Sequence, residues 1–265
     1  MEAHKGSIEN YFKDNPPASI KEAASVIERL TGIKRSTTQI RKFLLSIGMK
    51  IRKVGTIPAK ADYEEQRKFL QKEMEPKIKE AELGQRKLLF MDATHFVMAP
   101  FLGFLWCFVR VFIPSPSGRK RFNVLGAIDA VTHKLIAVTN DSYINAMSVC
   151  ELLKKVRAQY LDIPVTIILD NARYQKCAIV KDLAKDLQIE LLYLPAYSPN
   201  LNLIERLWKF VKKKCLYSKY YENFGYFKAS ILECLEKTET IYKEELDSLL
   251  RPKFQTFEKT QVMAL

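Results

Sequence analysis

The chain has 265 residues, of which 48% are hydrophobic and 28% charged, a balance typical of a folded protein and not of a disordered or fibrous one. Its length suits one sizeable domain plus a small one. The 43 Lys and Arg residues outnumber the 30 Asp and Glu residues and leave a net charge of +13, which favours a polyanionic partner, most simply nucleic acid.

Cysteine and hydropathy patterns exclude several classes of protein. The five cysteines are scattered without CxxC spacing, so the sequence predicts neither a disulfide framework nor a zinc site. The longest uncharged stretch, residues 96–109, is shorter than the roughly 18–20 apolar residues of a membrane helix, and no signal-like apolar segment opens the chain. We therefore expect a cytoplasmic protein with no membrane partner and no small-molecule cofactor.

Two short amphipathic helices are predicted near the N-terminus. The first begins after Ser19 and ends at Gly32, and the second runs from Ser36 to Gly48, so the pair resembles a helix-turn-helix. Basic and apolar residues alternate after Gly48, which predicts a short β-ribbon, or wing. A helical hairpin that only packs is the alternative. We expect a DNA-binding domain over residues 1–58, with these candidate DNA contacts: Lys34, Arg35, Thr38, Gln39, Arg41, Lys42, Lys50, Arg52 and Lys53.

Beyond a helical linker predicted over residues 59–86, apolar strands and amphipathic helices alternate. Three helices are predicted. The first begins at Asn145, the second spans residues 178–187 and the third spans residues 201–215. This order predicts an α/β fold in which helices cover the faces of a mixed sheet. The predicted strands are short apolar runs at residues 88–91, 105–113, 123–129, 135–140, 165–170 and 189–194.

Three acids stand where a site in such a fold would need them. Asp92 and Asp170 end apolar strands, and the carboxyl ends of strands are where open α/β sheets bind ligands. Glu205 lies in the first turns of the last of these helices. Carboxylates are hard oxygen ligands for Mg²⁺ or Mn²⁺, and two such ions can activate an attacking water or hydroxyl in a phosphoryl displacement. Each acid taken alone also fits a turn or a helix cap.

Basic side chains accompany these acids. Lys209 and Lys212 follow Glu205 at i+4 and i+7, so one helix face presents a carboxylate beside two ammonium groups, which suits nucleic acid. A solvated helix face is the alternative. A basic turn at residues 117–121 adds further candidate DNA contacts, namely Arg119, Lys120 and Arg121. The alternative for this turn is a hairpin that only keeps the protein soluble.

Two segments resemble signature segments of DDE transposases, DNARYQKC at residues 170–177 and LPAYSPNLNLIERLWKFVKKK at 194–214. The resemblance is to the insertion-sequence 630 family, the bacterial branch of the mariner-like superfamily, and it covers roughly residues 88–235. It implies that the catalytic, metal-binding acids are Asp92, Asp170 and Glu205, with 34 residues between the last two. It also implies that Asn171 and Asn202 support the acids or contact DNA.

The resemblance implies an architecture and an activity. We expect an RNase H-like catalytic domain over residues 87–225 and a C-terminal helical tail over residues 226–265. The implied activity is cut-and-paste transposition, in which two Mg²⁺ or Mn²⁺ ions per site support cleavage and strand transfer. The implied partner is double-stranded DNA, both terminal inverted repeats and target DNA. A homodimer is implied because the two ends of the element must be brought together. The implied location is the bacterial cytoplasm, on the nucleoid when DNA is bound.

Two departures from the family leave a second function open. Gln175 stands where many relatives have His, and one helix-turn-helix is found where family members commonly carry two. The alternative is an N-terminally truncated copy that acts as a non-catalytic DNA-binding repressor of transposition. A nuclease that acts on RNA is a third possibility, which the helix-turn-helix disfavours.

Overall fold

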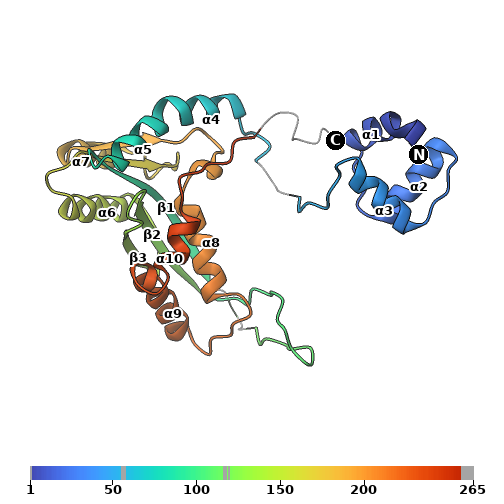
Figure 1. Ribbon diagram of the computed structural model, residues 1–265. Helices are drawn as coiled ribbons and strands as arrows, with labels where there is room; N and C mark the ends of the chain where they lie inside the picture. The colour runs from blue at the N-terminus through green and yellow to red at the C-terminus, as the bar shows by residue number, and fades with distance from the viewer. Residues whose placement is uncertain (1, 55–57, 116–117, 119, 258–265) are drawn as a thin grey trace. The chain divides into compact units, whose positions relative to one another are not determined.

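The computed structural model describes residues 2–54, 58–115, 118 and 120–257 (Figure 1). The chain divides into two compact units, with the boundary between Ile57 and Pro58. The smaller unit holds the N-terminal helices, and the larger unit holds a β-sheet with helices on both faces. Within the described ranges, no helix combines the length and the apolar character that crossing a membrane requires.

The predicted N-terminal helices form. A hydrogen bond of 3.1 Å from the Glu22 backbone N–H to Ser19 Oγ caps α2 (Ile20–Thr31), and Gly32 ends it in the left-handed conformation that glycine favours. Ser36 and Gln39 form a capping box at the start of α3 (Thr37–Ser46). A preceding helix, α1 (Lys5–Asp14), supports the pair through a shared core of Ile8, Phe12, Ala23, Ile27, Ile40 and Phe43.

The predicted wing does not form over residues 49–54. None of these residues belongs to a strand, and the side chains of Ile51 and Val54 are exposed. A β-ribbon needs a second strand to pair with, and the alternating sequence supplies only one. Residues 55–57, to which the prediction also extended, lie outside the described part of the chain.

The sheet of the larger unit is mixed, as predicted. Its order is β3-β2-β1-β4-β5, in which the β1–β2 and β2–β3 pairs are antiparallel and the β1–β4 and β4–β5 pairs are parallel. Four of the predicted strands are confirmed to within two residues at each end. The strands are β1 (Lys87–Val97), β2 (Arg121–Asp129), β3 (Leu135–Asn140), β4 (Val165–Leu169) and β5 (Ile189–Tyr193) (Figure 1).

The prediction that Asp92 ends a strand is wrong. The antiparallel ladder between β1 and β2 continues to the pair of Val97 and Arg121, so Asp92 lies in mid-strand opposite Gly126. The strand continues because its partner is long enough to pair with it, and the β1 sequence by itself does not contain that information.

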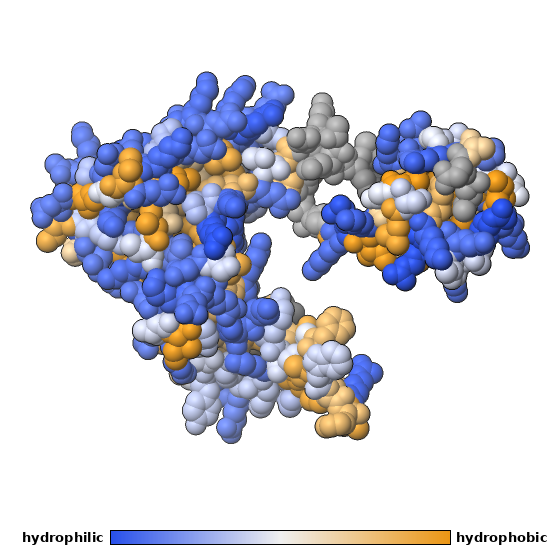
Figure 2. All heavy atoms as spheres, in the orientation of Figure 1, coloured by the Kyte–Doolittle hydropathy of each residue, from blue (hydrophilic) through white to orange (hydrophobic). Residues whose placement is uncertain are grey.

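The strand predicted at residues 105–113 is also wrong. Within the described residues 102–115 no strand forms, and the side chains of Phe104, Trp106 and Phe108 are fully exposed. Hydrophobic side chains gather on this segment, at the lower right of Figure 2. Aromatic and β-branched residues favour a strand locally, but none of the strands that the structure describes pairs with them.

Side chains of β1 alternate between the two faces of the sheet. Leu88 and Phe90 point to the face covered by α8 (Ile204–Cys215), α9 (Phe224–Glu236) and α10 (Lys243–Leu249). Leu89 and Met91 point to the face covered by α6 (Ala146–Gln159) and α7 (Ala178–Asp186). The same alternation places Asp92 on the face of α8.

The segment predicted as a linker is helical and packs on the sheet. It consists of α4 (Tyr63–Phe69), a π-helical turn (Leu70–Met74) and α5 (Glu75–Glu82). Met74, Ile78 and Ala81 are buried in the same core as the inward side of α8. The segment is therefore part of the larger unit.

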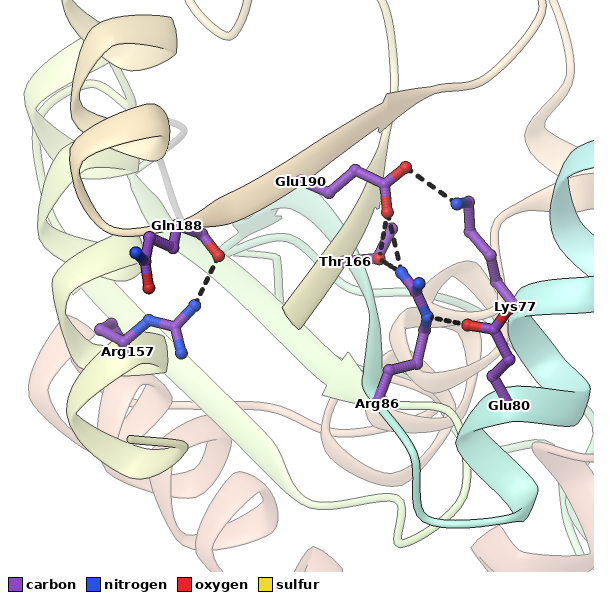
Figure 3. A network of polar contacts seen from close by, with 7 residues as sticks. All are labelled: Lys77, Glu80, Arg86, Arg157, Thr166, Gln188 and Glu190. Atoms are coloured by element: carbon purple, nitrogen blue, oxygen red, sulfur yellow. Dashed lines mark hydrogen bonds and ion pairs between the residues drawn. The ribbon is translucent and has the colours of Figure 1, made fainter. Parts of the chain in front are cut away.

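Polar contacts fix α5 and α6 to the strands (Figure 3). The carboxylate of Glu190 on β5 pairs with Lys77 of α5 and with Arg86, each at 2.8 Å. On the other side of the same figure, the Arg157 guanidinium of α6 donates to the carbonyl of Gln188 at 2.7 Å. These contacts connect helices to the amino-terminal end of β5, away from the acids described next.

Candidate active site

Asp92 lies in the middle of β1, on the face that α8 covers. Its Oδ2 accepts a hydrogen bond of 3.1 Å from Nε1 of Trp208, which is buried in α8. The ring fits because Gly126, the partner of Asp92 on β2, has no side chain. A Cβ there would come within 2.8 Å of the Trp208 ring. The sheet and α8 together fix this carboxylate.

Asp170 directly follows β4, the parallel neighbour of β1. Because Phe90 pairs with Ile168, Asp92 and Asp170 each lie two residues beyond a paired position and reach the same level of the sheet. A strand period of two places both on the same face. The Asp170 Oδ1 also accepts a hydrogen bond of 2.9 Å from the Ala172 backbone N–H, which closes the turn after the strand.

Glu205 is half-buried at the start of α8, which packs on the sheet through its apolar side. The start of the helix is tied to β1 by Asn202, whose Nδ2 donates to the carbonyl of Met91 at 3.2 Å. Met91 precedes Asp92, so this bond fixes the position of the start of α8, and with it Glu205, along β1 relative to Asp92. Asn202 is 5% exposed, a placement that fits support of the site and not direct contact with DNA.

One cavity of about 430 Å³ brings the three acids together. Asp92, Asp170 and Glu205 all line it, and Tyr197 and Asn202 form part of its wall. The acids come from the middle of one strand, the end of its neighbour and the start of a helix. The structure thus assembles in one place three residues that lie far apart in the sequence.

The electrostatics of the cavity reflect this crowding. Burial, followed by the negative charges of Glu205 and Asp170, raises the pKa of Asp92 to about 7. Burial and the charges of Asp170 and Asp92 likewise raise the pKa of Tyr174 to about 12. Both shifts disfavour the ionised form, chiefly because burial removes water from the two groups and secondarily because negative charges lie nearby.

The donor set fits a divalent cation. Three carboxylates are the hard oxygen ligands that Mg²⁺ and Mn²⁺ prefer, and a cation would offset the penalty on ionised Asp92. Among the residues that the structure describes, no three His, Cys, Asp or Glu side chains come close enough together to hold an ion jointly. The fit thus rests on the residue types and on their shared cavity, and not on their spacing.

Basic side chains flank the acids on α8. Lys209 is exposed and Lys212 half-buried, on the same helix face as Glu205. Neither lysine forms an ion pair with any other described residue. Asn171 is exposed beside Asp170, and its Nδ2 donates to the carbonyl of Leu194 at 2.5 Å.

A second cavity of about 640 Å³ adjoins the first and shares Asn171 and residues 194–196 with it. Three lysines line this second cavity, Lys68 of α4, Lys72 of the π-helical turn and Lys176, together with two acids, Glu65 and Glu73. The sequence analysis did not select these lysines, although the i, i+4 spacing of Lys68 and Lys72 places them on one helix face.

The other predicted DNA contacts lie on surfaces. Lys34, Arg35, Thr38, Gln39, Arg41, Lys42, Lys50, Arg52 and Lys53 are exposed in the smaller unit, where Gln39 also caps α3. In the larger unit, Lys120 lies 5.8 Å from the ring centroid of Phe224 and Arg121 is exposed at the start of β2. Arg119 lies outside the described residues.

The C-terminal segment is fastened to α8 next to the acids. Arg206, which follows Glu205, donates hydrogen bonds to the carbonyls of Leu249, Arg251 and Lys253 at 3.2, 2.6 and 2.5 Å. The Phe254 ring lies 5.7 Å from that of Phe90, centroid to centroid. The last described residues are thereby held against the layer that carries the site.

The sequence and the fold are similar to those of known transposition proteins. The family model of the DDE superfamily endonucleases matches residues 87–228. A curated relative, the insertion element IS630 uncharacterized 39 kDa protein of Shigella sonnei, is 29% identical over 99 residues. These residues are 37% of this chain and 29% of that protein, so the match spans less than a third of the relative's length.

Solved structures of Mos1 transposase share the fold at low sequence identity. The Mos1 transposase paired-end complex with left transposon end has a TM-score of 0.59 at 16% identity, covering 95% of this chain and 80% of that one. The pre-cleavage Mos1 transpososome gives 0.59 at 15% identity, covering 96% and 80%. The mixed sheet with its helices is thus the RNase H-like fold of the Mos1 catalytic domain.

Proposed function

The chain belongs to the DDE superfamily of endonucleases, and on that premise we propose that it is an IS630/mariner-like transposase, which cleaves DNA at the ends of an insertion sequence and joins them to target DNA. The observation that carries the proposal is the convergence of Asp92, Asp170 and Glu205 on one cavity. Burial and like charge already raise the pKa of Asp92 there, the condition that a bound cation relieves.

The three acids would hold the divalent cations, two per site. When bound, such ions activate the attacking water or hydroxyl and stabilise the leaving oxygen of an in-line phosphoryl displacement. Trp208 holds one oxygen of Asp92 in place by its hydrogen bond. Asn202 ties the start of the Glu205 helix to β1. These contacts fix the acids before the substrate arrives, which saves the cost of ordering them during the reaction.

The lysines around the cavity would bind the phosphates of DNA. Lys209 and Lys212 on α8 flank the acids on one side, and Lys68, Lys72 and Lys176 line the adjoining cavity. Exposed ammonium groups attract phosphates and release counterions on binding. The exposed basic residues of the smaller unit, around α3, would contact the terminal inverted repeats.

Further parts of the proposal concern assembly and location. Solved relatives are described as a paired-end complex and as a strand transfer complex, which supports double-stranded DNA as the partner and a homodimer that brings two ends together. Relatives crystallised with Mn or Mg support a divalent metal requirement. We place the protein in the bacterial cytoplasm, on the nucleoid when DNA is bound.

The test is metal-dependent cleavage of a supercoiled plasmid that carries the inverted repeats flanking the gene. With Mg²⁺ or Mn²⁺, the wild-type protein is expected to nick the plasmid, and Asp170→Asn and addition of EDTA should each abolish nicking. Asp182→Asn, which changes an exposed aspartate of α7, is the matched control and should nick normally. Binding of the repeats without any cleavage by the wild-type protein would instead support a repressor of transposition.

A further inference from the structure

Tyr197 occupies the wall of the acid cavity, in the loop between β5 and α8. It lines the same cavity as Asp92, Asp170 and Glu205, and its side chain is about half exposed, at 53%. Hydrophobic residues of this size are common on surfaces and by themselves indicate nothing. The position beside three carboxylates, and the backbone that holds the ring there, set this tyrosine apart.

The backbone of Tyr197 is in the left-handed region, with φ at +57°. Residues other than glycine rarely adopt this backbone conformation, and for a bulky residue it costs free energy that the surrounding structure must offset. Glycine would avoid that cost completely. The chain instead carries an aromatic ring at a strained position in the wall of its candidate active site.

Contacts from other segments hold this strained loop. Gln66, a glutamine of α4 that is 1% exposed, donates from Nε2 to the carbonyl of Tyr197 at 3.4 Å. Asn200 of the same loop donates from Nδ2 to Gln66 Oε1 at 3.0 Å and to the Gln255 carbonyl at 2.8 Å. Residues of α4 and of the C-terminal segment thus hold the backbone of the loop, which does not depend on local sequence alone.

We propose that Tyr197 is a base-stacking residue, which receives the nucleobase next to the phosphate bound at the acid cavity. The inference rests on the proposed function and deepens it, because it assigns a site for the base of the substrate. An aromatic face stacks on any base. Enzymes that do chemistry on a base take it out of the stack and hold it against aromatic side chains, and a base unstacked beside the reacting phosphate would need such a surface too.

The chemistry around the cavity divides accordingly. Carboxylates and lysines surround the place of the phosphate, and neither can stack on a base. Tyr197 lines the same cavity, and its aromatic ring can stack on a base. Gln66 is a positioning residue in this scheme, because it touches the Tyr197 backbone and lines neither of the two cavities.

The first experiment compares cleavage of two duplexes that carry the terminal repeat, one normal and one abasic at the nucleotide next to the scissile phosphate. Wild type is expected to cleave the abasic duplex about 5- to 150-fold more slowly, the range that loss of one stacked base implies. Tyr197→Ala should lose a similar factor on the normal duplex and show little further loss on the abasic one. Tyr197→Phe should behave as wild type, because it retains the ring.

Two further variants separate stacking from folding. Tyr197→Gly relieves the left-handed strain, so it should unfold at the same temperature as wild type or higher and still show the cleavage defect. Tyr226→Ala removes a tyrosine of similar exposure, 62%, on α9 and should cleave normally. The proposal is overturned if Tyr197→Ala cleaves the normal duplex at the wild-type rate. It is also overturned if Tyr197→Ala cleaves the abasic duplex more slowly than wild type by the same factor as it does the normal duplex, because the two effects are then independent.

A binding measurement keeps this inference distinct from the proposed function. With 2-aminopurine at the same nucleotide, binding of the non-cleaving Asp170→Asn protein is expected to quench the fluorescence, and Asp170→Asn/Tyr197→Ala should bind without that quenching. Quenching that depends on Tyr197 would support the base site even if wild type cleaves nothing. Equal quenching by both proteins would refute it even if wild type cleaves well.

Discussion

Trp208 and Asp92, which are 116 residues apart in the sequence, meet at a hydrogen bond of 3.1 Å between the indole Nε1 and the carboxylate Oδ2. A buried donor on one oxygen leaves the other oxygen of the acid for a cation. This hydrogen bond lowers the pKa of Asp92, against the larger opposing effects of burial and of the charges of Glu205 and Asp170. The indole therefore helps to keep the acid ionised.

Replacement of Trp208 by phenylalanine tests that role. Trp208→Phe keeps an aromatic ring in the core but removes the donor, so we expect nicking at limiting Mg²⁺ to fall roughly tenfold, the lower end of what a hydrogen bond to a charged group contributes. The defect should shrink as Mg²⁺ or the pH is raised, since both favour the charged carboxylate. Trp106→Phe changes an exposed tryptophan and serves as the control. Unchanged metal dependence in Trp208→Phe would contradict this role.

Asp92 should destabilise the metal-free protein at neutral pH. Its pKa of about 7 in the folded state lies above the ordinary value of 3.8, so the native state binds more protons than the unfolded state between these values. Its contribution to the free energy of unfolding is therefore greatest below pH 4 and is lost as the pH rises through 7. The full penalty at pH 8 is on the order of 4 kcal/mol.

Thermal unfolding in EDTA is the measurement. We expect Asp92→Asn to melt at a higher temperature than wild type at pH 8 and to lose that advantage at pH 4. Mg²⁺ should raise the wild-type melting temperature more than that of the variant. A wild-type protein that is as stable in EDTA as Asp92→Asn at pH 8 would show that the acid is not under this electrostatic penalty.

Gly126 should tolerate no side chain. A Cβ there would lie 2.8 Å from the Trp208 ring and 3.1 Å from Leu135 Cδ1, in a packed core. We expect Gly126→Ala to lower the free energy of unfolding by about 1–3 kcal/mol, as overpacking does, and to reduce nicking by displacing the indole from Asp92. Chemical denaturation gives the first quantity. Gly6→Ala, at a position with no heavy atom within 4 Å of the added Cβ, should lose no stability.

The lysines of the second cavity should contribute to DNA affinity through phosphates. The triple change of Lys68, Lys72 and Lys176 to alanine is expected to weaken binding and to reduce the slope of log affinity against log salt by up to about 3. The control removes the same charge from exposed lysines of α6 and α7, namely Lys154, Lys181 and Lys185. If both triple variants lose affinity equally, net charge and not the cavity determines binding.

Local signals predicted the elements that depend on local physics. Ser19 and Ser36 cap the two N-terminal helices as their positions indicate, and the apolar runs of β2 to β5 form strands. The errors concern pairing. Asp92 lies in mid-strand because β2 extends far enough to pair with β1 up to Val97, and residues 105–113 form no strand because no strand of the described chain pairs with them.

The same distinction applies to the site. The resemblance to a known family indicated the three acids, and the structure places them on one cavity. The resemblance also indicated Asn202 as a support of the acids, but it did not indicate Gln66, because Gln66 and Tyr197 are 131 residues apart and a single sequence contains no record of such contacts. Residues that support a site are therefore harder to predict than those that line it.

The hydrogen bonds from Arg206 and Asn200 to residues 249–255 have a consequence for synthesis of the protein on the ribosome. A growing chain that has reached residue 215 already contains all three acids, but it lacks the backbone carbonyls that fasten the start of α8 and the Tyr197 loop. All the residues that line the cavity precede residue 206, whereas these hydrogen bonds form only after residues 249–255 are made. The three acids are therefore synthesised well before the hydrogen bonds that fasten the segments around them.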